Sequence, residues 1–214
     1  MAARVTRAAR STAATGAAPR AARRVKPGAL LLAPGAGSSR DHSSLLAIEA
    51  AVAPLPVARM DFPYRKAGRR APDRAPVLLA AVVEEAATLC AAAGVKADRL
   101  VLGGRSMGGR LCSMAVAGDG VDPPLPARGL VLVSYPLHPP GRPDKLRTAH
   151  LPSLTVPCLF VHGTRDPFAT PDELQAATAT IAGPVTHVWL PGGHDLKGAD
   201  VKIADAVVEW LASC

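Results

Sequence analysis

The hydrophobic pattern of the chain alternates short apolar runs with longer Ala-rich stretches from residue 28 onward. Runs rich in Leu and Val, most of them bounded by Gly or Pro, are typical of strands that are buried on both faces. The Ala-rich stretches between them have the length of helices that cover such a sheet. This alternation predicts a three-layer α/β/α sandwich around a mostly parallel sheet of about six strands.

The apolar runs place the predicted strands at Ala29–Ala33, Val57–Asp61, Leu100–Gly103, Gly129–Ser134, Cys158–His162 and Thr186–Leu190. The helices are predicted at Ser43–Ala53, Ala75–Ala93, Met107–Ala117, Pro171–Ile181 and Gly198–Ala212. We expect Asp73 to cap the second helix and Thr170, which precedes a proline, to cap the fourth. The stretch 136–157 contains six prolines, so we expect a loop that is too short to form a lid domain.

Length and composition favour one domain with one substantial core, since the chain has 214 residues and 49% of them are hydrophobic. Aromatic residues make up only 3%, so small and medium aliphatic side chains must fill that core. We therefore predict a basic Ala/Arg-rich tail over residues 1–26 and a single folded domain over residues 27–214.

The net charge of +8 is concentrated in this tail. Residues 1–26 carry seven basic side chains and no acidic one, whereas the rest of the chain has 18 basic and 17 acidic residues. The tail has no aromatic residue for base stacking, and the chain has no recognisable nucleic-acid module, so we expect no nucleic-acid partner. Disorder or a misassigned start codon explains such a tract better than a binding arm does. The tail is also Arg-rich and acid-poor, as organelle transit peptides are, but it lacks the apolar stretch of a secretory signal.

No run of about 18 apolar residues is evident, so the sequence predicts no spanning helix and no membrane partner. The four cysteines, Cys90, Cys112, Cys158 and Cys214, lack the spacing of metal ligands. We expect buried free thiols, a cytoplasmic protein and no metal site.

A Gly-x-Ser-x-Gly pattern centred on Ser106 follows the third predicted strand. A sharp turn between strand and helix holds a serine in a strained conformation, and the glycines allow strand and helix to approach. The pattern alone occurs by chance in a Gly-rich chain, but here a strand precedes it and a helix with Leu111, Met114 and Ala115 on its inward face follows it. We predict that Ser106 is a nucleophile and that the Met107 amide stabilises an oxyanion.

A serine nucleophile needs a base, and the base needs a carboxylate to orient it. Asp166 follows the fifth predicted strand and His194 follows the sixth, which gives the chain order Ser, Asp, His. We assign Asp166 as the acid and His194 as the base, although each also fits an ordinary loop residue. Asp195 is a rival acid, but a neighbour in sequence rarely points back at the same ring. His162 is expected to be structural, with its side chain hydrogen-bonded beneath the loop.

The loop after the first strand, Ala33-Pro34-Gly35-Ala36-Gly37-Ser38, is the expected source of the second oxyanion donor. We choose the Ala36 amide, while a plain glycine-rich turn fits the sequence equally well. No complete phosphate-binding motif follows this strand, so we expect no nucleotide and no other cofactor.

Scarce aromatic and basic residues follow several strand ends, at the edge of an open α/β sheet where substrates bind. We predict substrate contacts from Phe62, Tyr64, Arg65, Arg105, Tyr135 and Phe168. Packing, for the rings, and a solvated charge, for the arginines, are the alternative explanations.

Six segments, spread over residues 28–214, resemble α/β hydrolases. They are Ala33–Ser38, Asp61–Arg65, Gly103–Arg110, Tyr135–Gly141, Gly163–Phe168 and Gly192–Asp195. The narrower resemblance is to the hydrolase-like family of the testis-expressed and NSL-complex-subunit proteins, which is related to dienelactone hydrolases. It implies an α/β-hydrolase fold and the triad roles given above for Ser106, Asp166 and His194.

The sequence therefore predicts a serine hydrolase that acts on an ester, thioester or lactone of a small acyl substrate. The usual antiparallel strands before the first parallel strand are not evident, and neither is a cap insertion after the fourth strand, so we expect an open site. The alternative is a non-catalytic protein that uses the same fold as an interaction platform, and the oligomeric state is left open.

Overall fold

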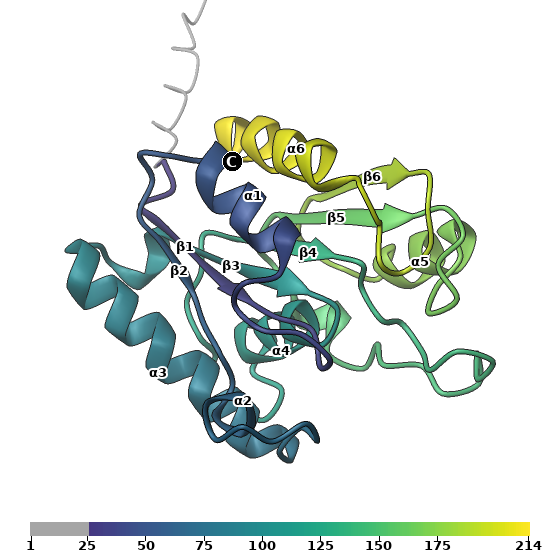
Figure 1. Cartoon of the computed structure of the whole chain (residues 1–214), viewed down its shortest axis with the longest axis horizontal. Helices are drawn as coiled ribbons and strands as arrows, with labels where there is room; N and C mark the ends of the chain where they lie inside the picture. Colours follow the sequence, from purple (N-terminus) through teal and green to yellow (C-terminus); the bar gives the residue numbers. More distant parts are fainter. Residues whose placement is uncertain (1–25) are drawn as a thin grey trace, which may run out of the picture.

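A single sheet of six parallel strands lies at the centre of the structure, a computed structural model that describes residues 26–214. The strand order is β2-β1-β3-β4-β5-β6, and every neighbouring pair is parallel (Figure 1). The strands are β1 (Ala29–Ala33), β2 (Val57–Arg59), β3 (Leu100–Arg105), β4 (Gly129–Val133), β5 (Cys158–Gly163) and β6 (Val185–Leu190). The six predicted strands are therefore all present, and the α/β fold class is confirmed.

Apolar side chains cover both faces of the inner strands, which explains why these strands read as continuous hydrophobic runs. All five residues of β1 are buried, and they alternate between two separate core clusters. Leu31 joins the cluster on one face of the sheet, together with Leu102 of β3. Leu30 joins the cluster on the other face, together with Val101. The central strands thus tie both cores to one rigid sheet.

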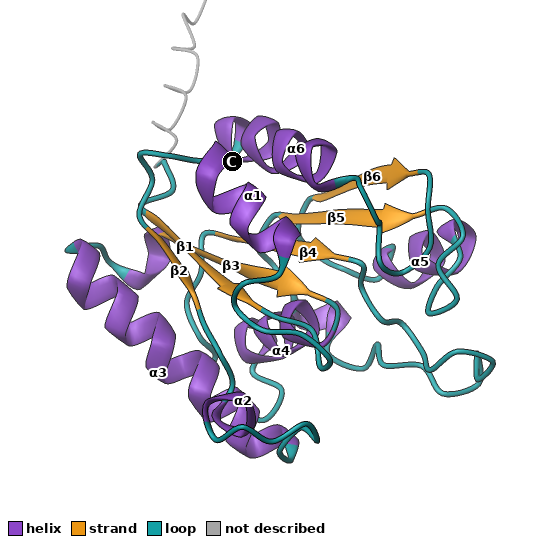
Figure 2. Cartoon of the chain, viewed as in Figure 1, coloured by secondary structure: helices purple, strands orange, loops and turns teal. Residues whose placement is uncertain are grey.

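Helices cover both faces of this sheet (Figure 2). One face carries α1 (Ser43–Ala51) and α6 (Asp200–Ser213), which pack against each other. The other carries α3 (Ala75–Ala93), α4 (Met107–Ala117) and α5 (Pro171–Thr178). Three short turns complete the described helices: α2 (Pro63–Lys66), η1 (Ala97–Arg99) and η2 (Leu151–Ser153).

By length and composition α3 is apolar enough to cross a membrane, a test that a helix packed into a protein core also passes. Its many alanines raise its hydropathy although no uninterrupted apolar run is present, since Glu84 and Glu85 lie within it. In the structure Leu78, Val82 and Ala86 are buried in the core cluster beside α4 and the sheet. The apolar face of α3 is thus used for packing within the domain.

The prediction that Asp73 caps α3 is wrong. The N-cap is Arg74, and the carboxylate of Asp73 instead pairs with Arg69 at 2.7 Å. The capping prediction for α5 is confirmed, since Thr170 and Glu173 form a capping box. Element ends differ by a few residues: β2 stops at Arg59, short of the predicted Asp61.

The sheet carries no inserted domain over its carboxyl edge within residues 26–214. The long connection from β4 to β5 contains only η2, and the rest of it is loop, as the prolines predicted. The predicted basic tail falls outside the described residues except for Lys26.

Candidate active site

Ser106 occupies the sharp turn between β3 and α4. Its backbone has φ 50° and ψ −119°, a conformation that L-residues rarely adopt. A Cβ on Gly104 or Gly108 would overlap the main-chain carbonyl oxygen of Ala33 in β1. Glycine is therefore required at both positions, because strand and helix pass too close to β1 for any side chain. The turn holds the hydroxyl of Ser106 at the carboxyl edge of the sheet.

His194 bridges the serine and a buried carboxylate. Its Nε2 lies 2.9 Å from Oγ of Ser106, and its Nδ1 lies 2.8 Å from Oδ2 of Asp166. An ionised carboxylate can only accept a hydrogen bond, so the proton is on Nδ1 and the lone pair of Nε2 accepts from the serine hydroxyl. Side chains that follow β3, β6 and β5 thus form one hydrogen-bonded row, with His194 between Ser106 and Asp166.

The carboxylate of Asp166 is fixed from several directions at 2% exposure. The backbone amide of Phe168 donates to Oδ1 at 2.8 Å, and Nε2 of His162 lies 3.4 Å from Oδ2. His162 also donates from Nε2 to the carbonyl of Ala169 at 3.0 Å, beneath the same loop, as expected. Burial lowers the pKa of His162 and favours its neutral form.

Arg105 connects the nucleophile strand to the loop that carries the base. Its Nη2 donates to the main-chain carbonyl of His194 at 2.9 Å and to Oδ1 of Asp195 at 3.1 Å. Asp195 therefore faces this guanidinium, and Asp166 is the acid that contacts His194. Arg105 lines the site as predicted, but it is engaged with the protein itself.

Met107 and Ala36, the two residues predicted to supply oxyanion donors, both lie at the pocket that contains Ser106. Met107 begins α4, where first-turn amides have no partner within the helix. Ala36 lies in the loop after β1, and within residues 26–214 its amide donates to no backbone carbonyl. The hydroxyl of Tyr64 donates to the carbonyl of Ala36 at 2.8 Å and so holds this loop in place.

Four of the six predicted substrate contacts are corrected by the structure. Phe62, Tyr64 and Tyr135 are at most 1% exposed, because their rings pack in the apolar core. Arg65 lies on α2, outside the residues that line the pocket. Phe168 does line it, with its ring centroid 4.0 Å from that of His194.

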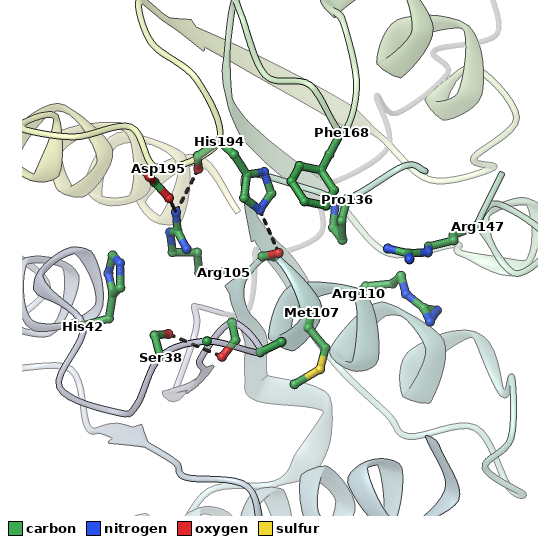
Figure 3. A pocket seen from close by; sticks show the side chains of 14 residues that line it. Ser38, His42, Arg105, Met107, Arg110, Pro136, Arg147, Phe168, His194 and Asp195 are labelled. Carbon is green, nitrogen blue, oxygen red and sulfur yellow. Dashed lines mark hydrogen bonds and ion pairs between the residues drawn. The ribbon is translucent and has the colours of Figure 1, made fainter. Parts of the chain in front are cut away.

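The pocket itself has a volume of about 670 Å³ and is shown in Figure 3. Its lining includes five residues that the sequence analysis did not assign: Ser38, His42, Arg110, Pro136 and Arg147. Arg110 could have been found, since it follows Ser106 by four residues on one helix face. Arg147 could not, because its position depends on how a long loop folds back.

Positive charge shapes the electrostatics of this pocket. Burial, and then the charge of Arg105, lower the pKa of His42. Burial, and then the charge of Arg110, lower the pKa of Arg147. The described part of the chain contains no cluster of three or more His, Cys, Asp or Glu residues that could hold a metal ion.

Comparisons with known proteins agree with this architecture. A family model described as an alpha/beta hydrolase domain matches residues 26–206. A protein from Xanthomonas campestris pv. campestris, described as a hydrolase of the alpha/beta superfamily, is 23% identical with a TM-score of 0.64, over 87% of this chain and 99% of that chain. Dienelactone hydrolase from Anabaena variabilis is 20% identical with a TM-score of 0.66, over 88% of this chain and 87% of that chain. Est1E from Butyrivibrio proteoclasticus is 17% identical with a TM-score of 0.68, over 88% of each chain. At these identities the likeness concerns the fold.

Proposed function

Because the chain belongs to the α/β-hydrolase family, we propose that it is a serine hydrolase that cleaves a carboxylic ester, thioester or lactone through an acyl-enzyme on Ser106. The observation that carries this proposal is the hydrogen-bonded row Ser106–His194–Asp166, which opens on a pocket of about 670 Å³. Nucleophile, base and orienting acid each have the contact that their role requires.

The first half-reaction forms the acyl-enzyme. Oγ of Ser106 attacks the substrate carbonyl carbon while its proton passes to Nε2 of His194. The resulting oxyanion accepts hydrogen bonds from the amides of Met107 and Ala36, with the N-terminus of α4 adding a favourable dipole. The intermediate collapses when the bond to the leaving group breaks, and His194 returns the proton to the leaving oxygen or sulfur.

The second half-reaction regenerates the enzyme. His194 removes a proton from a water molecule, and the hydroxide attacks the acyl carbon. The bond to Oγ then breaks, the proton returns to Ser106, and the carboxylic acid leaves. Throughout, the carboxylate of Asp166 holds Nδ1–H of His194 and stabilises the imidazolium that forms transiently.

The pocket supports a small acyl substrate. About 670 Å³ suits a compact molecule, and no inserted domain covers the site within residues 26–214. Among proteins of similar fold, one is a dienelactone hydrolase, and another, Est1E, has been solved with ferulic acid bound.

The test is a screen of p-nitrophenyl esters of increasing acyl length against wild type, Ser106→Ala and Ser153→Ala. Ser153 is an exposed serine on η2 and is the matched control. We expect turnover of short esters by wild type and Ser153→Ala, and a loss of at least about 10³-fold in Ser106→Ala. Folded wild-type protein without turnover of any ester, or full turnover by Ser106→Ala, contradicts the proposal.

A further inference from the structure

Two arginines line the candidate active-site pocket at the end opposite His42 (Figure 3). Arg110 belongs to α4 and lies one helical turn beyond Ser106. Arg147 comes from the loop between β4 and η2, so a distant part of the chain delivers it to the same opening. Both residues are half-buried, and Figure 3 shows both side chains at the same end of the pocket.

Neither guanidinium has a carboxylate partner among residues 26–214. Asp195 is the one acidic residue that lines the pocket, and it pairs with Arg105. Asp119 follows the end of α4, and its carboxylate lies 3.9 Å from Nδ1 of His150. Among residues 26–214, the guanidinium of Arg110 donates a side-chain hydrogen bond to the weakly accepting sulfur of Met114.

Elsewhere in this structure a partly buried arginine is paired with carboxylates. The guanidinium of Arg59, for example, contacts the carboxylates of both Asp41 and Glu49. In the pocket, by contrast, two like charges share a half-buried space, which raises the free energy of the empty site. The lowered pKa of Arg147, caused by burial and then by Arg110, reflects this repulsion. A bound anion between the two groups would remove it.

We propose that the substrate carries an anionic oxygen group, a carboxylate or a phosphate, which binds between Arg110 and Arg147 while its acyl carbonyl lies at Ser106. This inference rests on the proposed hydrolase function and specifies its substrate class. Guanidinium groups present several N–H donors in a plane and hold such groups bidentately. The single turn of helix between Ser106 and Arg110 favours a short spacer between the charged group and the scissile bond.

The kinetic test compares p-nitrophenyl hydrogen adipate with its methyl ester, in which an uncharged ester group replaces the free carboxylate. We expect wild type to prefer the anionic ester by at least about tenfold in kcat/KM at low salt, because charge-assisted hydrogen bonds are strong. The preference falls as salt screens the charges. Arg110→Gln and Arg147→Gln each reduce this preference by at least about fivefold, whereas Arg70→Gln, at an exposed site outside the pocket, preserves it.

A binding test separates failure of this inference from failure of the proposed function. Calorimetric titration of Ser106→Ala protein with adipate and with inorganic phosphate measures the anion site without chemistry, and circular dichroism establishes that each variant is folded. The site is supported if either anion binds and if Arg110→Gln and Arg147→Gln weaken that binding. The charge-preserving Arg147→Lys is expected to weaken it less than the two Gln variants do. The anion that binds more tightly identifies the chemistry of the site. Ester hydrolysis without charge preference overturns the inference and leaves the serine hydrolase intact. Absence of hydrolysis overturns the proposed function, and absence of anion binding in that case overturns the inference as well.

Discussion

The guanidinium of Arg105 donates a hydrogen bond to the main-chain carbonyl of His194 at 2.9 Å. The residue immediately before the nucleophile thus holds the loop that carries the base. Because β3 is a central strand and is buried along its whole length, this contact ties the His194 loop to the interior of the sheet. The 2.9 Å contact between His194 and Ser106 depends on that loop staying in place.

Replacing Arg105 therefore reduces turnover by displacing the base. We expect Arg105→Gln to lower kcat for a short ester by about tenfold or more with a smaller change in KM, since the loss concerns alignment for proton transfer. Asp195→Asn is the control, because the Asp195 side chain is 89% exposed and solvent screens its pairing with Arg105. Steady-state kinetics measure both, and equal losses in the two variants would contradict this role.

Removing the charge of Asp166 preserves the shape of the site but changes which nitrogen of His194 carries the proton. Asp166→Asn cannot fix the proton on Nδ1 of His194, so we expect kcat to fall by about 10³–10⁴-fold while the protein stays folded. Asp205→Asn, at an exposed position on α6, is the matched control and keeps wild-type kinetics. A loss of less than tenfold in Asp166→Asn would show that His194 does not need this acid.

The turn at Ser106 predicts a difference between two glycines of the site. Gly108→Ala places a methyl group against the carbonyl oxygens of Ala33 and Pro34, which are backbone atoms and cannot move aside. We expect a loss of at least about 3 kcal/mol in the free energy of unfolding. Gly37→Ala, where nothing lies within 4 Å of the added atom, changes it by less than about 0.5 kcal/mol. Urea denaturation measures both, and similar stabilities would contradict the close approach.

His150 predicts a pH dependence of stability. Burial lowers its pKa from 6.5 to about 4, against a smaller opposing effect of the Asp119 charge, and its Nε2 faces the hydroxyls of Ser113 and Tyr135. Between pH 6.5 and 4, His150 is protonated in the unfolded chain and stays neutral in the folded chain. This contribution to stability is therefore complete above pH 6.5 and is lost as the pH falls toward 4, by up to about 3 kcal/mol.

The control for this titration is His150→Gln, which has no proton to gain. The difference in unfolding free energy between wild type and His150→Gln is expected to be constant above pH 6.5 and to shift against wild type below it. Measurement of both proteins over this range isolates the contribution of His150, since the other histidines are common to both. A difference that does not change with pH would contradict the burial of a neutral imidazole.

The sequence predicted the fold well because its signals are local. A strand that is buried on both faces is an apolar run in the sequence, so β1 was predicted with its observed limits. The Ala-rich stretch of α3 was likewise predicted with the limits that the helix has. Less visible was α2, a single turn that starts at Pro63, where proline in a first helical turn was the available signal. The cap predicted at Asp73 failed because its carboxylate pairs with Arg69, four residues earlier, and the helix begins after Arg74 instead.

The residues of the candidate site that directly follow strands were predicted from the sequence. Those whose position depends on the folding of a long loop were missed. Ser106, Asp166 and His194 come together because parallel strands deliver their ends to one edge of the sheet. Phe62 and Tyr135 follow strands in the same way, yet the shortage of large apolar side chains draws them into the core. Which charges face the pocket depends on how the long β4–β5 loop folds, and no local pattern encodes that.

The central claim is that His194 activates Ser106 as a nucleophile, and reaction with a fluorophosphonate probe tests it most directly. Mass spectrometry of the digested protein is expected to find one adduct, on Ser106, in wild type. Labelling is absent in Ser106→Ala and slower by at least about 10²-fold in His194→Ala, which keeps the hydroxyl but loses the base. Folded wild-type protein that remains unlabelled, or that is labelled equally fast without His194, would contradict the account.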